Sequence, residues 1–495
     1  MDLQELRRRI DRIDDELVRL FAERMDVAAE VAAYKKEKGL PVLDASREQA
    51  KLQDVMSKAP ADLQEQTAAL YTLIFELSRG RQEELLKRSA ATHGLLGEKL
   101  GHSYSPAIHK MLGDADYRLF EKSPEELEDF LLRGDFEGLN VTIPYKKAVI
   151  PYCAELSDTA RAIGSVNTLV RRADGTLYGD NTDAFGFRSM VARCGVSAAG
   201  KKALVLGSGG ASVTVQAVLR ELGAGVVVIS RKGEDNYENL SRHSDAALIV
   251  NTTPVGMYPN NGEAPLSLDA FPDLEAVLDV VYNPAHTALL LAAEERGIPA
   301  VGGLRMLVAQ AKAAAEQFQR RPIADSEIDR IEDALAKQMR NIILVGMPGC
   351  GKSTLAKALG EALGRDVYDA DSEIERAAGM TIPEIFSRFG EGEFRRLETE
   401  ALRKLGKLSG AVIATGGGAV LREENYPLLH QNGMIVFVER ELSALPTAGR
   451  PISMQSDLAK LYEERLPRYQ RFADVTVRNE GEITDVCRRV MEECV

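Results

Sequence analysis

The sequence predicts a multidomain protein in which an all-helical segment precedes two α/β units. Residues 3–34 repeat apolar side chains every 3.5 residues, which is typical of a helix packed along its length against other helices. From about residue 90, short β-branched runs such as KALVLG and GVVVIS alternate with helical stretches and Gly-rich turns, the pattern of parallel α/β units. The run NIILVGMPGCGKST then begins a third unit. A chain of 495 residues suits about three domains of roughly 150 residues each.

Composition and charge exclude several kinds of protein. The net charge of −13 leaves no broad basic face for nucleic acid or an anionic membrane. No apolar run approaches the ~18 residues of a membrane span, and Met1 leads into a charged helix rather than a signal peptide. The five cysteines are scattered without a CxxC pair, which predicts free thiols and a cytoplasmic protein.

The first unit is expected over residues 1–88, and one charge in it looks misplaced. Its apolar seam consists of Leu3, Ile10, Leu17 and Val31 in one heptad series and Leu6, Ile13, Leu20, Val27 and Tyr34 in the other. Arg24 occupies a position of the first series, where it either sets helix register or binds a ligand. A helix from residue 2 to about 38 is roughly 55 Å long. So small a unit can hardly bury this seam alone, so we expect a homodimer.

Other polar residues accompany Arg24 along the helices of the first unit. They are Arg7 and Lys35 on the first helix, Asp44, Arg47 and Glu48 where a second helix starts, and Ser78 and Gln82 on one face of the last helix. Their spacing and order resemble the all-helical chorismate mutases over residues 3 to about 88. The resemblance implies that a helical dimer encloses dianionic chorismate and rearranges it to prephenate by holding the reactive conformer.

The resemblance also assigns roles to these side chains. The clamp on the two carboxylates would be Arg24 with the partner subunit's Arg7. The groups that stabilise charge on the breaking ether oxygen would be Lys35 and Gln82. The other substrate-binding residues would be Asp44, Arg47, Glu48 and Ser78, with Glu48 and Asp44 on the ring hydroxyl.

The second unit is expected over residues 91–324, with a substrate lobe at about 91–190 plus the C-terminal helices and a nucleotide lobe at about 198–300. In VLGSGGAS a glycine turn follows a strand and opens a helix, as in dinucleotide-binding folds. The predicted cofactor residues of this turn are Gly207, Ser208, Gly209, Gly210 and Ala211. The next strand ends in Ser230, Arg231 and Lys232 without an acid, and the two cations favour NADP(H) over NAD. Exposed surface charges are the alternative explanation.

Further motifs of this unit are GHSYSPAIHKML, NVTIPYKKAV, IGSVNTL, GDNTDAFG, NTTPVGM, DVVYNP and GGLRMLVAQA. In this order, over residues 93 to about 322, they resemble shikimate dehydrogenase, which implies reduction of 3-dehydroshikimate to shikimate; quinate is the alternative ring acid. The implied substrate-binding residues are Ser103, Ser105, Thr142, Asn167 and Gln310. Lys146 and Asp183 would be the catalytic pair, because reducing a ketone requires a proton at the forming alkoxide.

The third unit is expected over residues 340–495 and opens with GMPGCGKST, which fits G-x-x-x-x-G-K-[ST] between an apolar strand and a helix. Backbone N–H groups of such a loop wrap phosphate oxygens, Lys352 reaches the β- and γ-phosphates, and the Ser353 hydroxyl binds Mg²⁺. The predicted nucleotide-binding residues are Gly349, Gly351, Lys352, Ser353 and Thr354. This unit is therefore predicted to bind a nucleoside triphosphate.

Polar motifs follow this loop. YDADSEIE places Asp369 and Asp371 two residues apart after a short strand, so we expect both to point the same way, one serving the metal and the other the acceptor hydroxyl. Together with GEGEFRRLETEAL, ATGGGAV, GRPIS and RLPRY, these motifs resemble shikimate kinase over all of residues 340–495.

The resemblance implies that Asp371 orients the shikimate hydroxyl that attacks the γ-phosphate of ATP, which leaves Asp369 for Mg²⁺. The implied shikimate-binding residues are Arg395, Gly416, Gly417, Gly418 and Arg465. Arg450 would arrive on a mobile lid to meet the transferring phosphoryl group.

The chain is thus predicted to combine three enzymes of aromatic amino-acid biosynthesis. One alternative is a bifunctional dehydrogenase and kinase whose helical unit only senses chorismate or prephenate and dimerises. Between the two consecutive steps, we expect shikimate to diffuse freely rather than to be channelled.

Overall fold

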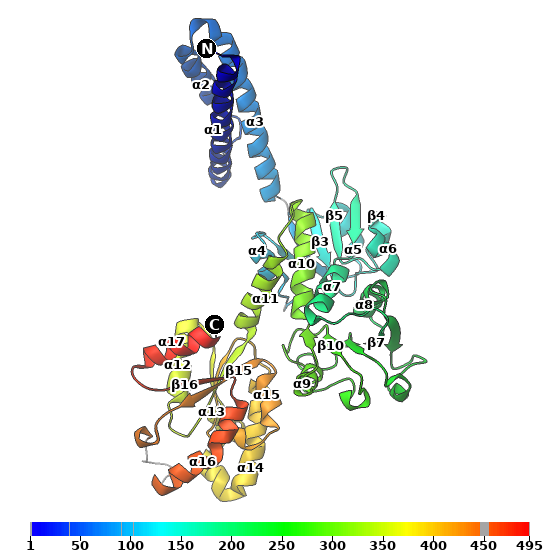
Figure 1. The fold of residues 1–495 in the computed structure, drawn as a ribbon, viewed down its shortest axis with the longest axis vertical. Coiled ribbons are helices and arrows are strands. Elements are labelled where there is room, and N and C mark those ends of the chain that lie inside the picture. Colours follow the sequence, from blue (N-terminus) through cyan, green and yellow to red (C-terminus); the bar gives the residue numbers. More distant parts are fainter. Residues whose placement is uncertain (1, 39, 91, 102, 446–454, 495) are drawn as a thin grey trace. The chain divides into compact units, whose positions relative to one another are not determined.

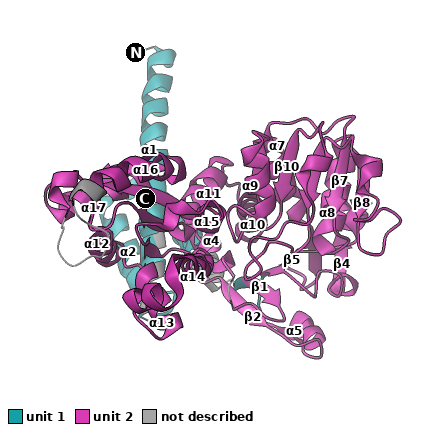
Figure 2. Cartoon of the chain, turned by 90° about the horizontal axis from the view of Figure 1, so that it is seen from below, with its two compact units in different colours: residues 1–93, 135–137 teal, residues 94–134, 138–495 magenta. Residues whose placement is uncertain are grey.

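The computed structural model describes residues 2–38, 40–90, 92–101, 103–445 and 455–494. The chain divides into two compact units, residues 1–93 with 135–137 and residues 94–134 with 138–495 (Figure 2). Within the described part of the chain, no helix is both long and apolar enough to cross a bilayer.

The first unit consists of helices up to residue 90. They are α1 (Leu3–Glu37), α2 (Ala45–Lys58), the 3₁₀ helix η1 (Ala61–Leu63) and α3 (Gln64–Ala90). The long first helix is present as predicted, and α1 packs against α3. Its apolar seam nevertheless stays open, since Ile10, Leu17 and Val27 are each more than half exposed. Among the described residues of this single chain, these three seam side chains are therefore left exposed to solvent.

The substrate lobe of the second unit is built on a six-stranded sheet in the order β2-β1-β3-β5-β6-β4. Its strands are β1 (His93–Gly97), β2 (Arg118–Glu121), β3 (Gly138–Val141), β4 (Cys153–Leu156), β5 (Thr168–Arg171) and β6 (Leu177–Asp180). Its helices are α4 (Ser105–Met111), α5 (Leu127–Arg133), η2 (Ile150–Tyr152), α6 (Asp158–Ile163) and α7 (Asp183–Cys194). The sheet is mixed, because β5 runs antiparallel to both β3 and β6.

The nucleotide lobe contains a parallel sheet of five strands in the order β11-β10-β9-β7-β8. These are β7 (Lys202–Leu206), β8 (Gly225–Ile229), β9 (Leu248–Asn251), β10 (Ala276–Asp279) and β11 (Ala300–Gly302); the helices are α8 (Gly210–Glu221), η3 (Leu240–His243), η4 (Leu268–Ala270) and α9 (Ala288–Glu295). Along β7, Val205 packs into one apolar cluster and Leu204 into another, so both faces of the sheet are covered. Parallel strands align their carboxyl ends at one edge, where the glycine turn lies.

Two helices connect this lobe to the last sheet. They are α10 (Leu304–Gln319), which packs on α7, and α11 (Ser326–Met339). Ile328 and Ile331 of α11 share a core with Ile108 of α4. Because α11 belongs to this core and ends two residues before the next strand, the junction is short and structured.

The last sheet is also parallel, in the order β13-β14-β12-β15-β16. Its strands β15 and β16 are labelled in Figure 1. Its strands are β12 (Asn341–Val345), β13 (Val367–Asp369), β14 (Val412–Ala414), β15 (Gly433–Glu439) and β16 (Val475–Arg478). Its helices are α12 (Lys352–Leu363), α13 (Ala370–Ala378), α14 (Ile382–Leu405), η5 (Ala419–Leu421), α15 (Asn425–His430), η6 (Leu442–Ala444), α16 (Gln455–Phe472) and α17 (Ile483–Cys494). The predicted fold class, helices followed by α/β units, is confirmed.

Candidate active sites

In the helical unit, α1 and α3 bring Arg24 and Ser78 together. The Arg24 guanidinium donates a hydrogen bond to the Ser78 hydroxyl and lies 5.9 Å from the centre of the Phe75 ring. Gln82, one turn beyond Ser78, is buried, and its Oε1 has no hydrogen-bond partner among the described atoms. A cation and a buried unsatisfied amide oxygen along one pair of helices are suited to hold a polar ligand.

Arg7 does not join this cluster within one chain. It is exposed and precedes Arg24 on α1 by a stretch of roughly 25 Å at ~1.5 Å per residue. A shared site for the two arginines therefore requires a second chain.

The other predicted residues of this unit lie around α2. The Lys35 ammonium donates to the Val42 carbonyl at 2.5 Å, the Asp44 carboxylate caps α2, and Arg47 is exposed. Glu48 accepts a hydrogen bond from Arg79 at 2.5 Å. Arg79 is absent from the prediction; its position directly after Ser78 was the available signal.

In the substrate lobe, the structure brings Lys146, Asp183, Asn167 and Gln310 into one cluster. The Lys146 ammonium donates to Asp183 Oδ2 at 2.6 Å, and Asn167 Nδ2 donates to Asp183 Oδ1 at 2.9 Å. The same Nδ2 lies 3.4 Å from Gln310 Oε1 on α10. The Lys146 and Asp183 side chains are 23% and 12% exposed, so the ion pair is sheltered yet reachable. A lysine and a carboxylate in direct contact can pass a proton to a bound oxygen.

Two threonines that the sequence reasoning missed orient this cluster. The Thr182 N–H and the Thr168 hydroxyl both donate to Asn167 Oδ1, at 2.7 and 3.1 Å. These bonds fix which way the Asn167 amide points, so that its Nδ2 faces Asp183. Thr168 and Thr182 stand beside the site residues in the motifs VNTL and NTDA, which was the available signal.

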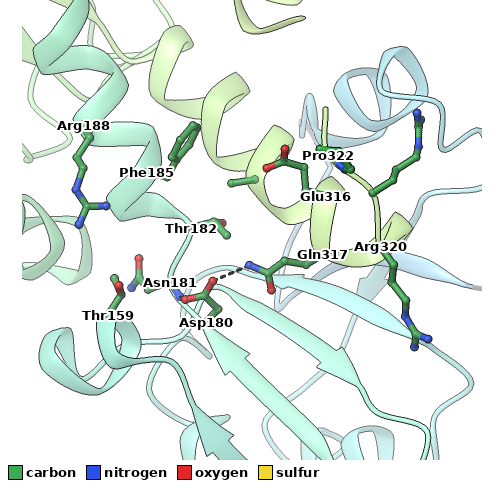
Figure 3. A pocket seen from close by; sticks show the side chains of 12 residues that line it. Thr159, Asp180, Asn181, Thr182, Phe185, Arg188, Glu316, Gln317, Arg320 and Pro322 are labelled. Atoms are coloured by element: carbon green, nitrogen blue, oxygen red, sulfur yellow. Dashed lines mark hydrogen bonds between the residues drawn. The ribbon is translucent and has the colours of Figure 1, made fainter. Parts of the chain in front are cut away.

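The remaining predicted shikimate ligands lie at the ends of nearby elements. Ser105 begins α4, its N–H donates to the Ser103 hydroxyl at 3.2 Å, and Thr142 directly follows β3. Figure 3 shows a separate cavity of about 510 Å³ beside the segment from Asp180 to Thr182, where Gln317 Nε2 donates to Asp180 Oδ2 at 2.6 Å. The predicted ligands are not among the described residues that line this cavity, so we do not assign the substrate to it.

The glycine turn of the nucleotide lobe lies at the carboxyl ends of adjacent strands. Gly207 has φ +102°, and a Cβ atom there would lie 2.9 Å from Thr253. A Cβ atom at Gly209 or Gly210 would have no atom within 4 Å, as expected where a ligand approaches the backbone. The Ser212 hydroxyl donates to the Gly207 carbonyl at 2.6 Å, which explains how serine fits the third fingerprint position.

The predicted cations lie beside this turn. The strand β8 pairs with β7 so that Leu206 faces Ile229, and Ser230, Arg231 and Lys232 follow directly. Both cations are exposed. Their charges are thus free to meet a 2′-phosphate at the end of β8.

A buried carboxylate, Asp279, was not singled out by sequence reasoning. It ends β10 and accepts hydrogen bonds from Asn251 Nδ2, the Val281 N–H and the Thr287 hydroxyl, at 3.0, 3.0 and 2.7 Å. Burial raises its pKa to about 6. Asp279 ties the end of β9 to the loop that follows β10.

In the last domain, the phosphate loop turns through Gly349 (φ +85°) and Gly351 (φ +101°), conformations that favour glycine. Lys352 begins α12, and its ammonium donates to the Gly346 and Met347 carbonyls at 2.9 and 3.0 Å. Thr354 follows on the exposed side of the helix. The lysine is therefore held inside its own loop.

The two aspartates at the carboxyl end of β13 make different contacts. Asp369 ends the strand and caps α13, whereas Asp371 already belongs to the helix, where the two-residue alternation of a strand no longer holds. Asp369 Oδ2 accepts a hydrogen bond from the Ser353 hydroxyl at 2.7 Å. The pair Ser353 and Asp369 fits the predicted metal site, while Asp371 turns inward.

Asp371 and the second glycine turn lie together in one polar cluster. A Cβ atom on Gly416 would lie 2.7 Å from Asp371 Oδ1, and one on Gly418 would overlap the Arg395 guanidinium. Arg465 donates to the Gly417 carbonyl at 2.9 Å. Burial, and next the charge of Asp369, raise the pKa of Asp371.

Two buried groups that sequence reasoning did not assign complete this site. Glu398 accepts a hydrogen bond from Arg395 at 2.7 Å, and burial raises the pKa of Glu398. The Tyr469 hydroxyl donates to the Gly417 carbonyl at 2.5 Å. The three-residue spacing of Arg395 and Glu398 on one helix face was a usable signal, whereas nothing local marked Tyr469. Arg450 lies outside the described residues.

A glycine turn flanked by cations, together with a Lys–Asp pair, defines a nucleotide-dependent dehydrogenase, and the phosphate loop with its acceptor site defines a phosphotransferase. Family models match the chain as chorismate mutase type II over residues 6–83, the substrate-binding domain of shikimate dehydrogenase over 95–169, and shikimate kinase over 348–495. A shikimate dehydrogenase (NADP(+)) from Clostridium beijerinckii is 36% identical over 250 residues, covering 46% of this chain and 91% of that protein.

A second relative of this name, from Oleidesulfovibrio alaskensis, is 39% identical over 251 residues, covering 46% of this chain and 88% of that protein. A chorismate mutase/shikimate 5-dehydrogenase fusion protein from Clostridium acetobutylicum, solved by crystallography, is 38% identical, with a TM-score of 0.47 over 50% of this chain and 97% of that chain. The chain belongs to the shikimate dehydrogenase family. It carries a type II chorismate mutase domain and a shikimate kinase domain as well.

Proposed function

We propose that the dehydrogenase domain uses NADP(H), with Lys146 and Asp183 handling the proton. The curated relatives are named for NADP(+), and the Gly207–Gly210 turn and the cations Arg231 and Lys232 suit such a cofactor. The bound cofactor supplies the hydride. Lys146, held at 2.6 Å from Asp183, donates the proton to the carbonyl oxygen as it becomes an alkoxide and recovers it in the reverse direction.

In the kinase domain we propose that ATP and Mg²⁺ bind at the phosphate loop and that Asp371 accepts the shikimate hydroxyl proton. The Ser353 hydroxyl and Asp369 offer two oxygen ligands to Mg²⁺, which ordinarily keeps several waters and binds substrate phosphates. Burial raises the pKa of Asp371, which makes this carboxylate a stronger base for the hydroxyl proton. Arg395 and Arg465 lie beside Gly416–Gly418, where they would pair with the substrate carboxylate.

For the mutase domain we propose a homodimer whose site draws on both chains. The exposed seam of α1 provides an apolar surface for a second copy, and Arg7 can join Arg24 only from a partner. The Arg24–Ser78 hydrogen bond beside the buried, unpartnered Gln82 oxygen is the observation that carries this site. Preorganised positive charge would hold the reactive conformer of chorismate.

Prephenate formation by the full-length protein and by Arg24→Ala tests this proposal. Arg19→Ala is the matched control, because among the described residues Arg19 forms its ion pairs with Glu16 and Glu23, on the exposed face of α1. We expect Arg24→Ala to lose at least about 100-fold in kcat/KM, the scale of a lost charge contact in a preorganised site, while it remains dimeric. An inactive wild type would favour the sensor alternative, and an active Arg24→Ala would make Arg24 a register residue.

For the two consecutive steps we infer free diffusion of shikimate. The proposed kinase residues lie after β12, β13 and β14, at the carboxyl ends of the strands. The hydrogen bonds with the dehydrogenase come instead from Lys407, Gln431 and Asn432, which precede β14 and β15 at the opposite end of the sheet. The kinase site therefore opens away from the dehydrogenase. A lag in shikimate 3-phosphate formation shorter than that of separated domains would contradict this inference.

A further inference from the structure

The kinase domain makes discrete polar contacts with the nucleotide lobe of the dehydrogenase. Asn432, just before β15, accepts a hydrogen bond at Oδ1 from the Ala285 N–H at 2.8 Å, and its Nδ2 donates to Asn283 Oδ1 at 3.3 Å. Beside it, the carbonyl of Gln431 accepts the His286 N–H at 2.9 Å. The kinase domain thus contacts three residues of one loop, Asn283, Ala285 and His286.

Two more hydrogen bonds join the same surfaces. Asn261 Nδ2 donates to the side-chain oxygen of Gln431 at 2.8 Å, and the Lys407 ammonium donates to the Pro259 carbonyl at 2.5 Å. A cavity of about 230 Å³ lies at this junction, lined by residues of both domains. Directional hydrogen bonds therefore contribute to the junction, and a substitution that removes one of them can weaken it.

The contacted loop begins at the buried carboxylate of the nucleotide lobe. Asp279 accepts the Val281 N–H at one end of the loop and the Thr287 hydroxyl at the other. The loop is consequently held on one side by Asp279 and on the other by Asn432 of the kinase domain.

The kinase domain also reaches the substrate lobe. Ser409, just before β14, is a neighbour of the Tyr104 hydroxyl: burial raises the pKa of Tyr104, and the Ser409 side chain lowers it. The Tyr104 ring meets Tyr282 of the nucleotide lobe edge to face, with 6.0 Å between ring centres. Tyr104 stands between Ser103 and Ser105, the proposed ligands of the shikimate carboxylate. One residue thus links the substrate lobe, the nucleotide lobe and the kinase domain.

We propose that the kinase domain is a brace for the dehydrogenase: Ser409 and Asn432 are positioning residues that hold Tyr104 and the Asn283–Thr287 loop, and with them the two lobes, in the arrangement that binds shikimate. The proposal rests on the dehydrogenase site proposed above. A substrate site between two lobes has its highest affinity when the lobes already hold the binding arrangement. If the substrate must first order the lobes, that ordering lowers the apparent affinity. The brace should therefore act on substrate binding more than on the chemical step.

The test is the double variant Ser409→Ala/Asn432→Ala in the full-length chain. The two hydrogen bonds of Asn432 are worth roughly a 2- to 10-fold change apiece, and Ser409→Ala removes the neighbouring contact with Tyr104. We expect the KM for shikimate in the dehydrogenase assay to rise about 5- to 50-fold, with kcat within about 2-fold of the wild type. Kinase activity should stay at the wild-type level, since both residues lie at the far end of the kinase sheet. Ser443→Ala, an exposed serine bonded to Glu441 of its own domain, is the matched control.

If the double variant keeps its kinase activity and its KM for shikimate in the dehydrogenase assay is unchanged, the proposal that the kinase domain braces the dehydrogenase is overturned. If the double variant loses kinase activity, Asn261→Ala replaces it, because that substitution breaks the Gln431 contact from the dehydrogenase side. A KM for shikimate that rises at least 2-fold in Asn261→Ala supports the proposal, and an unchanged KM overturns it. A wild-type chain that does not oxidise shikimate would instead refute the proposed dehydrogenase function itself.

Discussion

Gly416→Ala tests the proposed kinase site most directly. A methyl group at this position would lie 2.7 Å from Asp371 Oδ1 and 2.9 Å from Glu398 Oε1, whereas ordinary contacts begin at 3.4 Å. At least one carboxylate must then shift by about 0.7 Å, and both side chains are largely buried. Overpacking of this kind costs about 1–3 kcal/mol. Misplacing a reacting group by ~1 Å can cost up to about 100-fold in rate.

We therefore expect kcat for ADP formation with shikimate to fall about 10- to 100-fold in Gly416→Ala. The dehydrogenase and mutase activities of the same preparation should not change, which makes them internal controls for folding. Gly392→Ala is the matched control, because a Cβ atom on this exposed helical glycine meets nothing within 4 Å. Gly416→Ala with more than half of the wild-type kcat would refute the assignment of Asp371 to the reacting hydroxyl.

Three other predictions follow from the dehydrogenase and mutase domains. Asp183→Asn should lower shikimate oxidation by about 100- to 10,000-fold, since it removes the charge paired with Lys146, the proposed proton donor. The absorbance of NADPH measures this rate, and near-normal turnover would contradict the proton-transfer role. Leu17→Glu on the open seam should convert the proposed dimer to monomers and abolish prephenate formation alone; light scattering and the three assays check this outcome. Asp279 has a pKa raised to about 6 from 3.8, so the folded state holds an extra proton and its stability falls as pH rises through 6. Relative to Asp279→Asn, the wild type should lose about 1 kcal/mol of stability between pH 5 and pH 7, and thermal melts with no such pH dependence would contradict the burial argument.

Local spacing alone was sufficient to predict much of this protein. The phosphate loop, the glycine turn before Ser212 and the heptad seam around Arg24 are all short patterns whose geometry follows from the repeat of a helix or the turn after a strand. For the same reason the helices and the two kinds of α/β unit could be placed in order. The motifs also grouped the polar residues by site, because each motif lies at the end of a strand or on one helix face.

Only the tertiary structure decided how side chains from distant segments meet. Asp371 turns inward because α13 begins one residue before it, and a two-residue spacing cannot show where a strand becomes a helix. The Tyr469 hydroxyl reaches the Gly417 carbonyl from another helix, and Ser409 reaches Tyr104 from another domain. These contacts depend on packing between segments that share no local repeat. A sequence pattern predicts on which face of its own helix or strand a side chain lies. Which side chains of different elements come into contact is determined by how those elements pack.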